Sequence, residues 1–248
     1  NDLLDGGEGN DTLDGGAGND IYIVDSLTDV ITETSGTDEI RTTLNAYTNA
    51  SGIETLKFTG VGDFAGTGTS TAETLIGGSG ADTLDGQGGA DQLLGGLGND
   101  RYLISDATAT IVENAGEGID EVVTALDNYT LASNVEKLTL TKADGVTATG
   151  NALDNTITGN VGDDNLSGAA GKDTLIGSTG NDTLDGGNEA DYLQGGDGND
   201  VYFVESADDQ VIEDSGAGAG TADTLKTTLT NILLADNVEN LVYTAADF

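Results

Sequence analysis

The sequence predicts an all-β solenoid, and three observations lead to this prediction. A nine-residue unit, Gly-Gly-x-Gly-x-Asp-x-Leu-x, recurs along the 248 residues, with its clearest copy at residues 6–14. A longer module, made of a block of these units and a spacer, occurs roughly three times, which is typical of solenoids built from stacked repeats. The spacers alternate apolar and polar residues without a sustained helical period, so they also favour strands.

The nonapeptides form three blocks, and each block is followed by a spacer. The blocks are residues 1–23, 68–103 and 150–203, and the spacers are residues 24–67, 104–149 and 204–248. Each block ends in Asn-Asp-x-Tyr, with the tyrosine at Tyr22, Tyr102 and Tyr202. The simplest interpretation is one continuous solenoid in which the spacers form longer, irregular turns. Because the chain starts inside a nonapeptide and stops inside a spacer, we expect it to be a segment of a longer protein.

Two registers run in parallel through the blocks. Acids at the sixth position of the unit are Asp2, Asp11, Asp20, Asp82, Asp91, Asp100, Asp164, Asp173, Asp182, Asp191 and Asp200. Two residues after each acid stands Leu, Ile or Tyr, as at Leu84 and Leu184. The three residues around this position form a short strand with the apolar side chain inward and threonines outward. One register therefore presents oxygen ligands, and the other presents the core.

The glycines of the unit predict a tight loop around an ion. Those at the first position are Gly6, Gly15, Gly77, Gly86, Gly95, Gly159, Gly168, Gly177, Gly186 and Gly195. Glycines at positions one, two and four allow a turn with φ > 0 and leave the backbone carbonyl groups free to converge on an ion. Gln87, Asn160 and Ser178 replace the second glycine, and Glu189 replaces the fourth, where its Cβ is expected to distort the turn.

The entrances of the second and third blocks depart from the unit. Glu73 and Asn155 stand in place of the Asp, and their loops lack the double glycine. We interpret both as caps or half-sites with weaker binding. In the spacers, Asp29, Asp38, Asp120, Asp208 and Asp223 either add further ligands or are ordinary solvated acids.

Composition restricts the chemistry to oxygen ligands and a hard cation. The chain has no His and no Cys, so zinc, copper and iron sites are not expected. Carboxylates and backbone carbonyls suit Ca²⁺, which accepts about six to eight oxygens, and the number of loops predicts multiple Ca²⁺ ions. With 45 acids against 7 bases, the net charge of −38 disfavours nucleic acid and anionic membranes as partners. No signal peptide or apolar run of membrane-spanning length is present.

The same charge raises the alternative of a disordered acidic tail. A chain with this self-repulsion stays expanded unless the charge is neutralised. The strict spacing of acid and Leu argues against disorder in the presence of calcium, whereas without calcium disorder is the expected state.

These tandem nonapeptides resemble the RTX family of secreted bacterial proteins, which carry hemolysin-type calcium-binding repeats. The resemblance covers nearly the whole chain. It implies a calcium-bound parallel β-roll in which two nonapeptides make one turn, so that each loop pairs with the loop two repeats on. The pairs it implies include Asp2 with Asp20, Asp82 with Asp100, Asp164 with Asp182 and Asp173 with Asp191, with loop-glycine carbonyls completing each ion shell.

The resemblance also implies a cellular setting. Proteins of this family leave the cell by a type I secretion machine, unfolded in the calcium-poor cytosol, and fold outside, which makes this region extracellular or cell-surface. We expect a structural role, in an adhesin, surface layer or filament, with possible self-association or contact with a cell surface or polysaccharide. The alternative is an accessory C-terminal module of a secreted polysaccharide-modifying enzyme or hydrolase. We expect no catalysis by this chain, because a Ser-His-Asp or Cys-His arrangement requires His.

Overall fold

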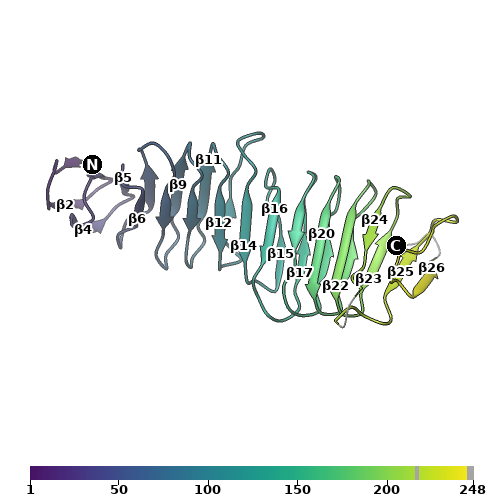
Figure 1. The fold of residues 1–248 in the computed structure, drawn as a ribbon. Helices are drawn as coiled ribbons and strands as arrows, with labels where there is room; N and C mark the ends of the chain where they lie inside the picture. Colours follow the sequence, from purple (N-terminus) through teal and green to yellow (C-terminus); the bar gives the residue numbers. More distant parts are fainter. Residues whose placement is uncertain (216–217, 245–248) are drawn as a thin grey trace. The chain divides into compact units, whose positions relative to one another are not determined.

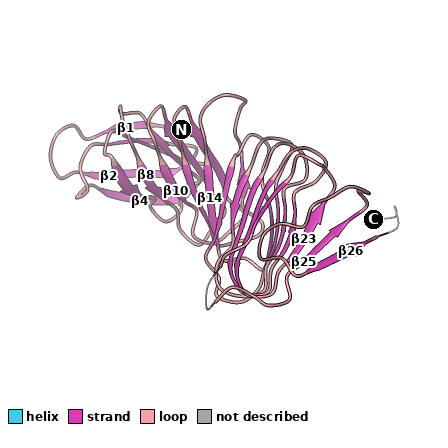
Figure 2. Ribbon diagram, turned by 45° about the vertical axis from the view of Figure 1, so that its right-hand side comes forward, coloured by secondary structure: helices cyan, strands magenta, loops and turns pink. Residues whose placement is uncertain are grey.

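The computed structural model describes residues 1–215 and 218–244, and the secondary structure in these residues consists of strands (Figures 1 and 2). The chain divides into two compact units, Asn1–Glu121 and Val122–Phe248. Each unit is a parallel β-solenoid, which confirms the predicted fold class. Among the described residues, no helix is long and apolar enough to span a membrane.

Unit one is built from short strands that alternate between two sheets. The strands are β1 (Leu3–Asp5), β2 (Thr12–Ala17), β3 (Ile21–Val24), β4 (Val30–Ser35), β5 (Glu39–Thr42), β6 (Ala46–Thr48), β7 (Thr55–Phe58), β8 (Ala65–Thr67), β9 (Thr74–Gly78), β10 (Thr83–Asp85), β11 (Gln92–Gly96), β12 (Arg101–Ile104) and β13 (Thr110–Ile111). One sheet has the order β1-β3-β5-β7-β9-β11-β13, and β6, β8, β10 and β12 follow one another in a second. Strands β2 and β4 pair separately.

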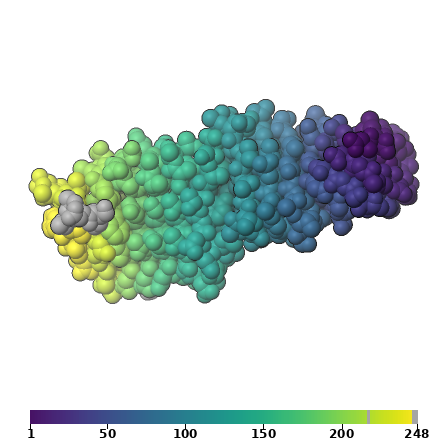
Figure 3. Space-filling model, turned by 180° about the vertical axis from the view of Figure 1, so that it is seen from behind, coloured from purple at the N-terminus to yellow at the C-terminus, as the bar shows by residue number. Residues whose placement is uncertain are grey.

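Unit two repeats this arrangement. Its strands are β14 (Glu121–Thr124), β15 (Asn128–Thr130), β16 (Lys137–Leu140), β17 (Thr147–Thr149), β18 (Thr156–Thr158), β19 (Asn165–Ser167), β20 (Thr174–Thr179), β21 (Thr183–Asp185), β22 (Tyr192–Asp197), β23 (Val201–Val204), β24 (Gln210–Ile212), β25 (Thr224–Thr227) and β26 (Asn240–Tyr243). One sheet has the order β15-β17-β19-β21-β23-β25-β26, and the other runs from β14 through the even-numbered strands to β24. In the space-filling view, successive stretches within each unit lie beside one another in sequence order (Figure 3).

The strand register follows the nonapeptide count. Leu84 pairs with Tyr102, and Leu175 pairs with Leu193, always in parallel. Two nonapeptides therefore make one turn, as the resemblance implied. In the spacers the turns change length: equivalent loop positions are 18 residues apart within the blocks, but 16, 20 and 23 residues apart at three spacer turns.

The core consists of the inward apolar side chains of the sheets, one or two from most strands. The predicted inward positions of the second and third blocks are fully buried, at Leu75, Leu84, Leu93, Tyr102, Ile157, Leu166, Leu175, Leu184, Leu193 and Tyr202. The first block is less covered, because Leu4 is only half-buried. Because each turn buries so few large side chains, the hydrophobic effect alone gives this core limited stability.

Candidate metal sites

The acids of successive turns form a hydrogen-bonded ladder along the loops. One oxygen of each carboxylate, Oδ1, accepts the backbone N–H of the equivalent residue one turn earlier. The N–H of Asp164 donates to Oδ1 of Asp182 at 2.8 Å, and the N–H of Asp182 donates to Oδ1 of Asp200 at 2.7 Å. All four predicted pairs are bonded in this way. The pairing of loops two repeats apart is therefore confirmed.

The second carboxylate oxygen, Oδ2, differs along the ladder. In a set that we call the interior acids, Oδ2 is buried and has no hydrogen-bond partner among the described residues. The interior acids are Asp11, Asp20, Asp38, Asp91, Asp100, Asp173, Asp182, Asp191, Asp200 and Asp223. A buried carboxylate oxygen without a donor is costly, and a cation bound at each of these positions would remove that cost.

Burial shifts the protonation of three of the interior acids. Loss of solvent raises the pKa of Asp100, Asp182 and Asp200 to about 7, although the N–H bond to Oδ1 opposes this shift. In each case the neighbouring carboxylate of the ladder raises the pKa further. Without a cation, these groups therefore hold protons near neutral pH.

The first glycine of each unit makes room for Oδ2. A Cβ on Gly177 would overlap Oδ2 of Asp182, and one on Gly95 would overlap Oδ2 of Asp100. None of the predicted first-position glycines has φ > 0, so that part of the prediction is wrong for this position. Positive φ occurs instead at the second and fourth positions, as at Gly96 and Gly98, where φ is 100° and 128°. In the Asp100 loop, the first glycine is required for space and the other two for backbone conformation.

Replacements of these glycines have different effects. Gln87 and Ser178, at the second position, keep the left-handed backbone with φ of 65° and 88°. Asn160, also at the second position, and Glu189, at the fourth, do not have positive φ. The loop containing Glu189 thus departs from the conformation of its neighbours, as its Cβ predicts.

Backbone carbonyls face the same space as Oδ2. A Cβ on Gly177 would lie 2.7 Å from the carbonyl oxygen of Gly195, in the next turn, as well as on Oδ2 of Asp182. Gly77 has the same relation to the carbonyl of Gly95, at 2.6 Å. Carboxylate and carbonyl oxygens from two adjacent turns therefore converge on a small volume. This set of hard oxygen donors fits Ca²⁺.

At the block entrances the protein satisfies its own polar groups. Oε2 of Glu73 accepts the N–H of Thr69 at 2.7 Å, and Oδ1 of Asn155 accepts the N–H of Asn151 at 2.7 Å. This bonding supports the interpretation of Glu73 and Asn155 as caps. The acid of the next loop in each block is bonded in a similar way. Oδ2 of Asp164 accepts the N–H of Asn160 at 3.0 Å. Oδ2 of Asp82 likewise accepts the N–H of Gly78, so we call Glu73, Asp82, Asn155 and Asp164 the entrance residues.

Several spacer acids continue the ladder. Asp38, Asp120 and Asp223 are buried and accept the N–H of Asp20, Asp100 and Asp200. Asp29 accepts the N–H of Asp11 at 3.1 Å. Asp208 is exposed and is not part of the ladder; its neighbour Asp209 accepts the N–H of Asp191 instead. The sequence alone did not separate these two adjacent acids.

A second ladder, which sequence reasoning missed, runs beside the first. At the fifth position, side-chain oxygens accept the N–H of the next turn, opposite in direction to the Asp ladder. Oδ1 of Asp163 accepts the N–H of Asn181 at 2.7 Å, and Oδ1 of Asn181 accepts the N–H of Asn199 at 2.9 Å. The signal was present as the repeated Asn or Asp just before the sixth-position acid. Where Asn or Asp occupies this position, as at Asn181, its side chain and backbone tie the loop to both neighbouring turns.

A parallel β-roll whose loops stack carboxylates and glycine carbonyls defines a class of cation-binding solenoid. The RTX calcium-binding nonapeptide repeat matches the chain in four copies, at residues 1–31, 67–102, 149–184 and 176–211. Because these ranges span just over half of the sequence, the chain belongs to this family and is an RTX calcium-binding β-roll region. A comparison with curated proteins gives no match.

Proposed function

We propose that calcium binding between stacked loops drives the folding of this region outside the cell, where it is a structural part of a secreted or cell-surface protein. The observation that carries the proposal is the row of buried, unpartnered Oδ2 atoms in the interior acids. Each would meet an ion together with glycine carbonyls of its own and the adjacent turn. The proposed ligands are the predicted sixth-position acids and first-position glycines, with the entrance residues contributing weakly.

Charge and core size support this coupling. A net charge of −38 opposes compaction, and bound Ca²⁺ would reduce it. The thin core supplies limited stability, and a metal site that forms only on folding adds its binding free energy to folding. Because cytosolic calcium is low and extracellular calcium is millimolar, as the family resemblance implies, the same chain would be unfolded before export and folded after it.

A calcium titration tests the proposal. Circular dichroism should show a largely unstructured chain in chelator and β-structure in millimolar calcium. Equilibrium dialysis should count roughly five to ten bound ions, because interior loops bind and entrance loops contribute little. A β-rich spectrum unchanged by chelator would contradict the proposal, and so would a folded protein that binds no calcium.

The structural role, as opposed to catalysis, is tested separately. We propose that this chain acts as a scaffold, since it offers dense carboxylates but no His or Cys for nucleophilic chemistry. The calcium-loaded protein should show no turnover of polysaccharides or esters. Reproducible turnover that survives purification, and is lost on a single carboxylate substitution, would overturn this role.

A further inference from the structure

The end of each nonapeptide block carries a cluster of three acids, and the same cluster recurs in all three modules. We call these the junction clusters. They are Asp20, Glu33 and Asp38; Asp100, Glu113 and Asp120; and Asp200, Glu213 and Asp223. Within each cluster the three carboxylates each offer an oxygen atom lying within 4.8 Å of the others. All three clusters are at least largely buried.

We propose that each junction cluster is a cation site of its own, distinct in composition from the nonapeptide sites and holding a Ca²⁺ ion between the last nonapeptide loop and the first spacer loop. The inference rests on the proposed function, because it assumes a folded, calcium-loaded roll. It goes further in giving the ion at the end of each block a third carboxylate, from a spacer glutamate.

The glutamate enters the cluster because it occupies the place of a first glycine. Gln194 in β22 pairs with Ile212 in β24, so the next residue along, Glu213, lies opposite Gly195. Leu93 pairs with Ile111 in the same way, which brings Glu113 near Gly95 two residues later. A carboxylate therefore extends from the spacer turn into the space that a glycine leaves open in the nonapeptide loops.

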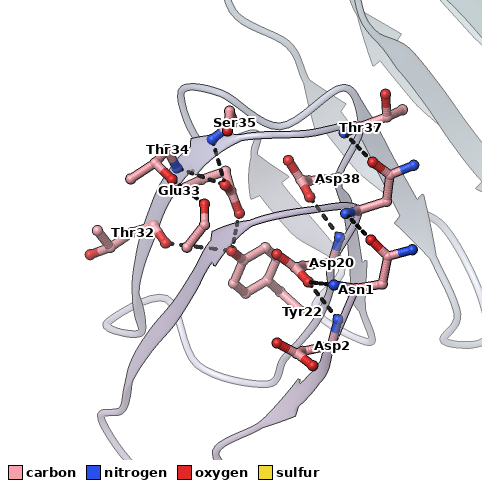
Figure 4. Close-up of polar contacts among 12 residues, drawn as sticks. Asn1, Asp2, Asp20, Tyr22, Thr32, Glu33, Thr34, Ser35, Thr37 and Asp38 are labelled. Carbon is pink, nitrogen blue, oxygen red and sulfur yellow. Dashed lines mark hydrogen bonds and ion pairs between the residues drawn. The ribbon is translucent and has the colours of Figure 1, made fainter.

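A tyrosine fixes the orientation of this glutamate. The Tyr202 hydroxyl accepts the N–H of Gly195 at 2.8 Å and donates to Oε2 of Glu213. The Tyr102 hydroxyl likewise accepts the N–H of Gly95 at 2.9 Å and donates to Glu113. In the first module the Tyr22 hydroxyl donates to Glu33, as Figure 4 shows beside Asp20 and Asp38. The tyrosine that ends each block is thus the residue that positions the third carboxylate.

Unpartnered oxygens belong to these clusters, which is the independent evidence for a ligand. In the first module, a Cβ on Gly15 would lie 2.8 Å from Oδ2 of Asp20 and 3.0 Å from Oε2 of Glu33, so the two oxygens border the same space. Oδ2 of Asp200 and Oδ2 of Asp223 belong to fully buried side chains and have no hydrogen-bond partner among the described residues. Asp20 and Asp38 have the same unpartnered Oδ2 and are about 1% exposed. The ion pairs found in the described part of the chain do not include Asp200, Glu213 or Asp223. Three ionised carboxylates this close repel one another, and a cation between them would remove that repulsion.

The composition of the cluster predicts a stronger site than a nonapeptide loop provides. A nonapeptide site draws its carboxylates from two paired loops and fills its shell with carbonyls, whereas a junction cluster adds a third carboxylate to such a pair. Calcium affinity rises with the number of charged ligands, so the junction sites should fill first in a titration. The bound ion would then hold the last nonapeptide loop against the first spacer loop.

Terbium luminescence tests the inference directly. Tb³⁺ replaces Ca²⁺ at oxygen sites, and in a chain without Trp its emission is sensitised by nearby tyrosine. The experiment uses a protein with the substitution Tyr192→Phe, which removes the tyrosine adjacent to Asp191. Tyrosine-excited emission should appear at the lowest Tb³⁺ additions and be displaced by calcium.

The decisive variant combines Glu33→Gln, Glu113→Gln and Glu213→Gln, which keeps the tyrosines and the side-chain volumes. It should bind three ions fewer by dialysis. The Tb³⁺ concentration at the midpoint of the first emission phase should rise by roughly tenfold or more. Asp208→Asn, an exposed acid outside the ladder, is the matched control and should behave as the parent protein.

The outcomes separate this inference from the proposed function. If the parent protein binds no ion, the proposed function fails. If it folds with calcium but the triple variant retains the full ion count and the early emission, only the junction sites are refuted. Where the triple variant does not fold in saturating calcium, Glu213→Gln alone must lose one ion and that site's share of emission, and an unchanged count overturns the inference.

Discussion

Entrance and interior acids share one motif but differ in what completes their bonding. Oδ2 of Asp164 accepts a backbone N–H from its own loop, whereas Oδ2 of Asp182, one turn later in the same ladder, has no donor. Both side chains are about equally buried, at 2% and 0% exposure. The difference therefore lies in hydrogen bonding and not in solvent access.

If folding depends on calcium as proposed, this difference predicts where along a block that dependence begins. An entrance turn is complete as protein alone, while each interior turn has an oxygen that only a cation or a proton can satisfy. A block would thus start from a turn that needs no ion and extend through turns that do. Four experiments can break or sharpen this distinction.

The largest effect is expected in the core, where entrance and interior turns should not differ. Leu166 and Leu184 are both fully buried, so Leu166→Ala and Leu184→Ala should each cost about 2–5 kcal/mol through the cavity that they leave. Because no ion can refill this volume, the loss should persist at saturating calcium. Chemical denaturation in excess calcium measures it. Full rescue of either variant by calcium would mean that the core and ligand registers are not separate.

Substitutions of an interior acid and an entrance acid should differ in their effect on the calcium midpoint of folding, whereas the two leucine substitutions should have similar effects on stability. Asp182→Asn removes a charge facing the ion, so the calcium midpoint of folding should rise by roughly tenfold, with recovery at higher calcium. Asp164→Asn removes a charge whose Oδ2 is already bonded to Asn160, so its midpoint should move much less. Calcium titrations followed by circular dichroism compare the two. Equal shifts would show that entrance and interior acids bind alike.

Acidification should act on the interior acids in the absence of calcium. Burial raises the pKa of Asp100, Asp182 and Asp200 from 3.8 to about 7. Between these values the folded chain holds protons that the unfolded chain releases, so stability without calcium falls as pH rises from about 4 to about 7. The chelated protein should therefore contain more β-structure at pH 5 than at pH 7.5. Over the same pH range, calcium affinity should fall as the pH is lowered, because protons compete with calcium for the carboxylates. A chelated protein whose fold does not change with pH would contradict this.

The smallest effect is expected in the fifth-position ladder. Asn181→Ala removes the acceptor for the N–H of Asn199, at an exposed site, and should cost about 0.5–1.5 kcal/mol. Asn188→Ala, an exposed asparagine outside this ladder, serves as the control. Thermal unfolding in saturating calcium resolves the pair. If Asn181→Ala and Asn188→Ala lose equal stability, the fifth-position ladder does not stabilise the fold.

Much of the architecture follows from local spacing in the sequence. The nine-residue period places Leu84 and Leu184 in the core and aligns Asp164 with Asp182, because two short strands and two loops of constant length close each turn. The family resemblance supplied the turn size, which spacing alone left open.

Other features depend on neighbours that the sequence does not display. Whether Asp164 or Asp182 keeps a free Oδ2 depends on an N–H group in its own loop that only the folded turn brings close. The choice of Asp209 over Asp208 depends on spacer length, since turns outside the blocks lose the regular count. The junction clusters escaped notice because Glu33 is an unremarkable spacer acid until strand pairing places it beside a glycine position.

The variable length of the spacer turns indicates that the roll tolerates insertions at these turns. Asp120 stands 20 residues after Asp100, and Asp223 stands 23 residues after Asp200, yet both side chains accept the same kind of N–H bond as their 18-residue counterparts. The bonds between rungs, and not the number of residues between them, set the alignment of the turns. In the 20-residue turn, residues 114–116 are exposed, and the bond between Asp100 and Asp120 is kept. A peptide tag or epitope grafted at this loop should therefore be displayed while the strands on either side keep their partners.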